Sequence, residues 1–202
     1  MRKIKLTIKR NKPRVLLGIY YDADAHENSR YVLFITPKIP MMQRQTMGSK
    51  QPKSIQAISF CVRNTQKIIE GEISLPWMFE EEYIESIDKN PRLIVCAVIG
   101  KVLSRKQALN MLPETPIYQV ADPNRPKAQE FNSRTWAADA FEKLKIAGAI
   151  SGMDWRTAEG GIRAYRDQNK AEKYWSIAAE GRRVTEPRVP ILDLLVGVEI
   201  RS

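Results

Sequence analysis

The chain has 202 residues, of which 43% are hydrophobic and 28% are charged, enough for one globular domain with a sizeable core. This composition excludes a disordered, fibrous or coiled-coil chain. The longest apolar run, residues 93–99, is much shorter than the roughly 20 residues that a membrane span needs. The basic start Met1-Arg2-Lys3 is not followed by an apolar stretch, so we expect no signal peptide and a cytoplasmic protein.

Two cysteines and one histidine restrict the possible chemistry further. Cys61 and Cys96 can form at most one disulfide, so the chain is not a disulfide scaffold and suits a reducing compartment. A structural zinc site needs about four cysteine or histidine ligands, and this chain supplies no such set. We therefore expect no metal and no cofactor.

The formal net charge of +10 is concentrated at the start of the chain. Residues 1–70 carry 14 Lys or Arg against 4 Asp or Glu, whereas residues 71–202 carry 19 of each. A basic surface attracts nucleic acid, anionic lipid or an acidic partner, and it also serves simply as a solvated surface. For the domain organisation we expect a basic N-terminal strand or arm over residues 1–14, followed by a single domain over residues 15–202.

Alternating or short apolar runs predict strands in the first half of the chain. The expected strands are residues 4–8 (an edge strand), 15–21, 31–35, 55–62 and 68–75, with a turn at 22–28 and a long loop at 37–52. We expect residues 55–62 and 68–75 to pair through the polar turn at 63–66. The three glutamates at residues 80–82 are expected in a solvated turn or a binding ridge. Residues 93–99 have no polar face, which predicts a central strand.

Helices are expected to dominate the second half of the chain. Ser104 begins a capping-box pattern for a short helix, and four prolines between residues 113 and 126 predict a loop. Asn132 caps a helix that ends at Gly148, and Asp154 caps another with a candidate kink at Gly160-Gly161. A last short apolar element covers residues 191–196. Strands followed by helices indicate an α+β fold, with helices packed on a mostly antiparallel sheet.

Four short segments resemble those of a family of small, uncharacterised fungal proteins. They are SRYVLFITPK at residues 29–38, FCVRN at 60–64, FNSRTW at 131–136 and VPILDLL at 189–195. That family is in turn similar to the permuted papain-like fold of NlpC and lecithin-retinol-acyltransferase-like proteins. The resemblance covers most of the chain from about Val15 onward, and it implies a papain-like version of the α+β fold.

The resemblance also implies a thiol site, built from one histidine on each of two strands and a cysteine at the start of a helix. In this chain Arg30 and Cys61 stand at the two histidine positions, and Ser133 stands at the nucleophile position. The resemblance implies that these three residues meet in one cleft. Because Arg30 cannot accept a proton at neutral pH, and a serine needs an adjacent base, we expect no papain-type hydrolase or acyltransferase activity.

Each of these candidate residues has both a functional and a structural interpretation. In the functional interpretation, rewired thiol chemistry uses Cys61, with its pKa lowered by Arg30 and with His26 as the base. In the structural interpretation, Cys61 is simply a strand residue and His26 is a solvated turn residue. Arg30 with Asn132 and Ser133 at a helix N-terminus suits an anionic ligand, whereas a salt bridge to a core carboxylate is the alternative for Arg30.

One further candidate and three function classes remain open. Trp77, next to a proline, is a candidate exposed platform for a ligand. The favoured function is a non-hydrolytic relative of a papain-like thiol enzyme that binds a small or anionic ligand in the former active-site cleft. The second is an enzyme with rewired chemistry there, such as a fungal natural-product tailoring or cyclisation step. The third is a basic nucleic-acid-binding module, which rests on charge alone.

Overall fold

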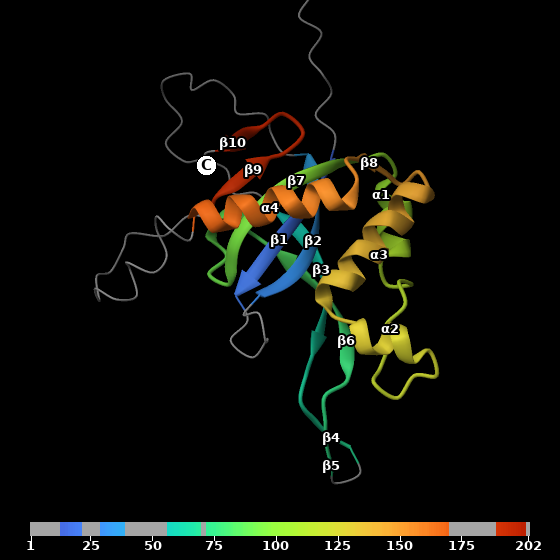
Figure 1. Cartoon of the computed structure of the whole chain (residues 1–202). Coiled ribbons are helices and arrows are strands. Elements are labelled where there is room, and N and C mark those ends of the chain that lie inside the picture. Colours follow the sequence, from blue (N-terminus) through green and yellow to red (C-terminus); the bar gives the residue numbers. More distant parts are fainter. Residues whose placement is uncertain (1–12, 22–28, 39–55, 70–71, 170–188, 201–202) are drawn as a thin grey trace, which may run out of the picture.

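The computed structural model describes residues 13–21, 29–38, 56–69, 72–169 and 189–200 of the chain (Figure 1). The predicted strand at 4–8, the turn at 22–28 that contains His26, and most of the loop at 37–52 lie outside the described residues. Among the described residues, no helix is long and apolar enough to cross a membrane.

The main sheet has eight strands in the described part of the chain, with the order β10-β9-β7-β1-β2-β3-β6 and with β8 paired to β7. The strands are β1 (Pro13–Tyr21), β2 (Ser29–Lys38), β3 (Ala57–Asn64), β6 (Trp77–Ile84), β7 (Leu93–Val102), β8 (Ile150–Gly152), β9 (Ile191–Asp193) and β10 (Val198–Ile200). Every pair is antiparallel except β7 with β9, which is parallel. The predicted α+β class with a mostly antiparallel sheet is confirmed.

Strand β7 lies inside the sheet, between β1 and β9, as its apolar sequence predicts. Its burial pattern leaves almost no residue exposed between Leu93 and Val102. A strand that is apolar on both alternating faces needs cover on both, and an interior position provides it.

The predicted pairing of residues 55–62 with 68–75 is wrong, because β3 pairs along its whole length with β6. The segment between them forms a separate small hairpin of β4 (Lys67–Ile69) and β5 (Glu72–Ser74), which projects from the ends of β3 and β6 (Figure 1). Pro76 has no N–H for a ladder bond, so the long ladder resumes only at Trp77. The three glutamates at 80–82 therefore lie in a strand rather than in a turn.

Four helices follow the early strands in the described residues: α1 (Arg105–Met111), α2 (Arg125–Glu130), α3 (Ser133–Ile146) and α4 (Trp155–Asn169). The predicted caps form, since Ser104 accepts from the Gln107 amide and Asp154 from the Thr157 amide, at 3.4 and 2.8 Å. Helix α2 was not predicted, because the four prolines of residues 113–126 suggested a loop. Pro126 is nevertheless compatible with the helix, because it lies in the first turn, where no N–H is needed. Helix α4 is continuous through Gly160-Gly161.

The sheet separates two hydrophobic cores. Helices α3 and α4 cover one face, where their side chains pack on alternate strand residues, including Leu17, Tyr31, Leu33, Phe60 and Val62 (Figure 1). The intervening strand residues form the second core with the 3-10 helix Ile87–Lys89 and the last strands, including Leu16, Tyr20, Phe34, Cys61 and Ile191. We call these the helix face and the far face. Consecutive residues of one strand therefore belong to different cores.

Candidate functional site

Arg30 and Cys61 lie on the far face of the sheet and share a partner. The Arg30 side chain is 7% exposed, and its Nη1 lies 3.7 Å from Oε2 of Glu80. Its guanidinium carbon is 5.6 Å from the ring centroid of Tyr20, the residue opposite Arg30 on β1. The Cys61 thiol contacts the same Glu80 oxygen at 3.8 Å. Arg30 thus forms a salt bridge, but its partner is a half-exposed carboxylate on β6, the second strand away from β2, and not the core carboxylate considered from the sequence.

Two more arginines extend this arrangement, which we call the arginine cluster. It consists of Arg30, Arg63 and Arg92, with Glu80, Glu82 and the Tyr20 ring. Arg63 Nη1 lies 4.0 Å from Glu80 Oε1, and Arg92 Nη2 lies 3.2 Å from Glu82 Oε2. The Arg92 guanidinium also lies 5.6 Å from the centroid of Tyr20. Two cations therefore contact one aromatic ring, a favourable arrangement because the ring face is electronegative.

The Cys61 thiol is held in its protonated form. Burial raises the pKa of Cys61 to about 12; Arg30 acts in the opposite direction, and Glu80 adds to the increase. The expected lowering by Arg30 is therefore present but is outweighed by burial and by the carboxylate. A thiol with this pKa has almost no thiolate at neutral pH and is a poor nucleophile.

Ser133 approaches β2 from the helix face. It is the first residue of α3 and is 7% exposed, and its Oγ accepts a hydrogen bond from the Tyr31 amide at 3.1 Å. Tyr31 follows Arg30 directly, but its side chain belongs to the helix-face core. Ser133 thus lies against the strand that carries Arg30, whereas Arg30 and Cys61 point to the far face. This differs from the expectation of one shared cleft, because neighbouring strand residues point in opposite directions.

The Tyr31 amide is available to Ser133 because two strands separate. The ladder of β2 with β3 covers only Leu33, Phe34 and Ile35 of β2, so it ends before Tyr31. A buried amide beyond the end of a ladder needs another acceptor, and the first side chain of α3 supplies it. The Ser133 hydroxyl therefore stabilises the junction of helix and sheet.

Asn132 satisfies the first amides of α3. Its Oδ1 accepts from the amides of Arg134 and Thr135 at 2.9 and 3.0 Å, and Thr135 Oγ1 accepts from the Asn132 amide at 2.9 Å. The sequence predicts Asn132 as the cap of this helix, and the structure shows that the cap is a capping box completed by Thr135. Because these amides already donate to Asn132, the helix N-terminus has fewer donors for the anionic ligand expected there.

A second charged group, which sequence reasoning missed, lies on the helix face around Glu159 of α4. Glu159 is 7% exposed and receives two hydrogen bonds from the Arg134 guanidinium. Arg163 Nη1 lies 3.5 Å from the Glu159 carboxylate, and the Tyr31 hydroxyl donates to it at 3.4 Å. Burial acts to raise the pKa of Glu159, but Arg134 and Arg163 outweigh it and lower the pKa below its usual value. This carboxylate therefore joins α4, α3 and β2.

Trp77 has a structural role rather than that of an exposed platform. It is half-buried, and its ring packs edge-to-face on Phe131 with the centroids 5.5 Å apart. The backbone amide and carbonyl of Trp77 both bond to the Gln119 side chain, each at 2.9 Å. The tryptophan thus anchors the start of β6 to the loop before α2. His26 lies outside the described residues.

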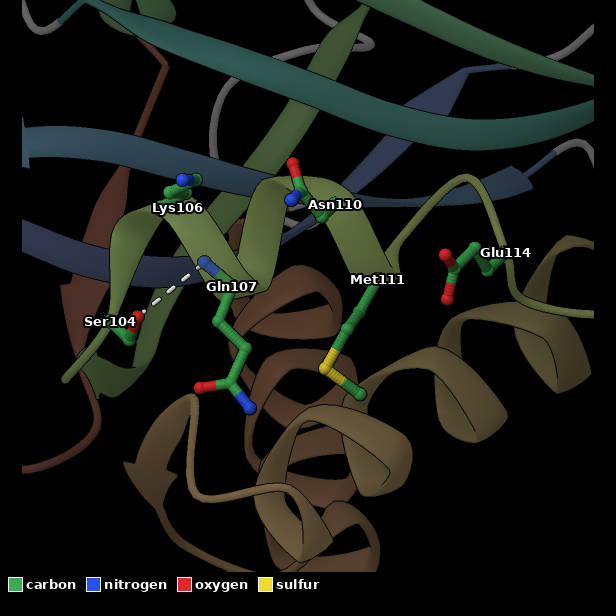
Figure 2. A pocket seen from close by; sticks show the side chains of 6 residues that line it. All are labelled: Ser104, Lys106, Gln107, Asn110, Met111 and Glu114. Carbon is green, nitrogen blue, oxygen red and sulfur yellow. Dashed lines mark hydrogen bonds between the residues drawn. The ribbon is translucent and has the colours of Figure 1, made fainter.

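A surface pocket of about 320 Å³ lies elsewhere, along α1 (Figure 2). It is lined by Ser104, Lys106, Gln107, Asn110, Met111 and Glu114. None of the candidate residues from the sequence borders it. In the described part of the chain, no group of three His, Cys, Asp or Glu residues could hold a metal ion.

Comparison with protein families matches residues 12–201 to a model described as a family of unknown function (DUF6914). Comparisons with curated proteins and with solved structures found no match.

Proposed function

The chain belongs to this family of unknown function, and from its geometry we propose a non-hydrolytic binding protein that takes a small anionic ligand at the arginine cluster. The proposal includes descent from a permuted papain-like fold. In support of that descent, α3 begins against β2, the strand whose first residues resemble the histidine strand of that fold.

The observation that carries the proposal is the shared partner of two arginines. Arg30 and Arg63 lie 3.7 and 4.0 Å from the same carboxylate, that of Glu80, whose side chain is 42% exposed. Both separations exceed the roughly 2.8 Å of a charge-assisted hydrogen bond. A carboxylate or phosphate group of a ligand can take the place of Glu80 and form shorter, bidentate bonds to the guanidinium groups.

The surroundings favour binding over covalent catalysis. Cys61, next to Glu80, is protonated, so it can donate a hydrogen bond to an anion but does not attack a carbonyl. The Ser133 hydroxyl accepts from the Tyr31 amide on the other side of the sheet. In the described residues no histidine stands beside either group. An acyl-transfer step would need such a base.

Calorimetric titration of the full chain with inorganic pyrophosphate and with citrate tests the proposal. Arg63→Gln is the informative variant, because Arg63 is half-exposed and its guanidinium pairs with Glu80. We expect at least about tenfold weaker binding of the probe that binds the natural chain, as for loss of one charged hydrogen bond. Arg156→Gln, an exposed arginine on α4, is the matched control and should bind as the natural chain does.

Two results would contradict the proposal. One is that neither probe binds, or that Arg63→Gln binds as tightly as the control variant. The other is turnover of ester or amide substrates by the natural protein that Ser133→Ala or Cys61→Ala abolishes, since this would show a working nucleophile.

A further inference from the structure

Strand β6 carries two carboxylates on the far face of the sheet, and both are paired with arginine side chains of the arginine cluster. Oε2 of Glu80 lies 3.7 Å from Nη1 of Arg30. Oε2 of Glu82 lies 3.2 Å from Nη2 of Arg92. Glu81, between them in the strand, is directed to the opposite face, because successive strand side chains alternate. The arginine cluster therefore holds two separate anionic groups of the chain itself.

The spacing of these two anionic groups is set by the strand. Glu80 and Glu82 are two positions apart on one face of β6, so their side chains leave the strand about 7 Å apart. The arginines that face them are also near each other, because the guanidinium carbons of Arg30 and Arg92 each lie 5.6 Å from the ring centroid of Tyr20. The two guanidinium carbons are therefore separated by at most twice that distance, about 11 Å.

Both carboxylates can be displaced more easily than the arginine at the centre of the cluster. The side chains of Glu80 and Glu82 are 42% and 56% exposed, so each can turn into water. The pair of Glu82 with Arg92 is exposed on both sides, and such pairs contribute little to stability. Arg30, in contrast, is 7% exposed and lies against the Tyr20 ring. A ligand can therefore replace the glutamates while the buried cation stays in place.

Resting on the anion site proposed above, we infer that the ligand carries two anionic groups about 7 Å apart, the spacing of alternate strand residues, as in a six-carbon dicarboxylate. One group takes the place of Glu80 between Arg30 and Arg63. The other takes the place of Glu82 at Arg92. An extended six-carbon chain fits, because five C–C bonds of about 1.5 Å in a zigzag separate its terminal carbons by about 6.4 Å.

Attachment at two points gives this site a preference for ligand length. Once the first group is bound at Arg30, the second group meets Arg92 as part of the same molecule, so its contact costs little further translational freedom. A shorter dianion or a single carboxylate occupies only one of the two positions and loses this gain. Glu82 competes with the second group for Arg92, so removal of its charge should strengthen the binding of a ligand of matched length.

Calorimetric titration of the full chain with adipate, succinate and hexanoate tests the length requirement. The carboxyl carbons of succinate are only about 4 Å apart, and hexanoate has the six-carbon chain of adipate with a single carboxylate. We expect adipate to bind at least about tenfold more tightly than either, as for the gain of one charged hydrogen bond. Arg92→Gln, at a side chain that is 51% exposed, should remove this advantage. Arg156→Gln on α4 removes the same charge and should keep it.

The possible results separate this inference from the anion site on which it rests. If pyrophosphate or citrate binds and Arg63→Gln weakens it, but adipate has no advantage over succinate and hexanoate, the two-point ligand is wrong and the anion site stands. The same holds if Arg92→Gln keeps the full preference for adipate, or if Glu82→Gln weakens adipate binding instead of strengthening it. If none of the anions binds, both the site and the two-point ligand are overturned.

Discussion

Cys61 is a residue whose environment decides its chemistry. Burial raises its pKa to about 12, so at pH 7 its thiolate fraction is roughly a thousandfold below that of an unfolded thiol with the ordinary value of 9.0. We therefore expect iodoacetamide to alkylate Cys61 in the folded chain at least about a thousandfold more slowly than in urea, as followed by mass spectrometry of its peptide. Rapid labelling at pH 6 that Arg30→Ala suppresses would instead support a reactive thiol.

Glu159 makes folding depend on pH. Its pKa is lowered in the folded chain, so its contribution is present above the usual value of 4.5 and is lost as the pH falls through the folded pKa. Glu159→Gln should lower the free energy of unfolding by about 2 kcal/mol at pH 7, the cost of losing hydrogen bonds to a charged group. The difference from the natural chain should shrink below pH 4.

Urea unfolding at several pH values measures this effect of Glu159→Gln. The control is Glu142→Gln, whose half-exposed carboxylate pairs with Lys145 at 3.5 Å. Surface pairs of this kind contribute little to stability. An equal loss of stability in both variants, or a loss at Glu159 that does not depend on pH, would contradict the role assigned to this carboxylate.

At the scale of single elements, adjacent glycines of α4 provide a matched comparison. A Cβ at Gly160 meets nothing within 4 Å, whereas a Cβ at Gly161 lies 2.8 Å from Cδ2 of Leu194. Gly160→Ala should stabilise the chain by up to about 1 kcal/mol through helix propensity. Gly161→Ala should gain less or lose stability, because Leu194 must move. Thermal unfolding of the two variants measures the difference, and equal stabilisation would show that α4 does not pack on Leu194.

Elements with local signals were predictable from the sequence. The caps Ser104, Asn132 and Asp154 each act within three residues, and the apolar run of β7 determines its interior position by itself. The partner of β3 was not predictable, because residues 65–76 intervene and both candidate partners contain apolar residues. The Glu159 contact with Arg134 spans 25 positions. Only the four-residue spacing from Glu159 to Arg163 could have suggested an ion pair there.

The candidate site was predictable only in part, for a reason of geometry. The resemblance placed Arg30 and Ser133 near one strand, and the Ser133 contact with Tyr31 agrees with that placement. It could not give the side of the sheet, because a shift of one residue in β2 reverses the direction of a side chain. Arg63 and Arg92 carried no motif, since charged residues on a strand face are ordinary when read alone.

At the scale of the whole molecule, the C-terminal strands β9 and β10 extend the sheet beyond β7 and form one of its ends. Ile191 on β9 is 1% exposed in the far-face core, and the Pro190 carbonyl accepts from the Cys96 amide at 3.1 Å. Ile191→Ala should lower the free energy of unfolding by about 2–5 kcal/mol through the cavity it leaves. Val196→Ala, at a side chain that is 68% exposed, should have little effect.

Urea titration distinguishes two ways in which Ile191→Ala can act. If the end of the sheet unfolds with the rest, the midpoint falls while the slope with denaturant stays the same. A decreased slope, with a second transition, would show that β9 and β10 form a separately unfolding unit.

The Tyr31 amide donates a hydrogen bond to Ser133. The exchange of this amide proton can therefore report on ligand binding at the far face of the sheet, where Arg30 lies. Arg30 and Tyr31 share a peptide unit, so a ligand that draws the Arg30 guanidinium away from Glu80 also shifts the donor that α3 holds. Anion occupancy should then change the hydrogen–deuterium exchange of the Tyr31 amide, while that of Leu33, inside the β2–β3 ladder, stays constant. A spectroscopist could thus observe the buried arginine without any probe on its own face.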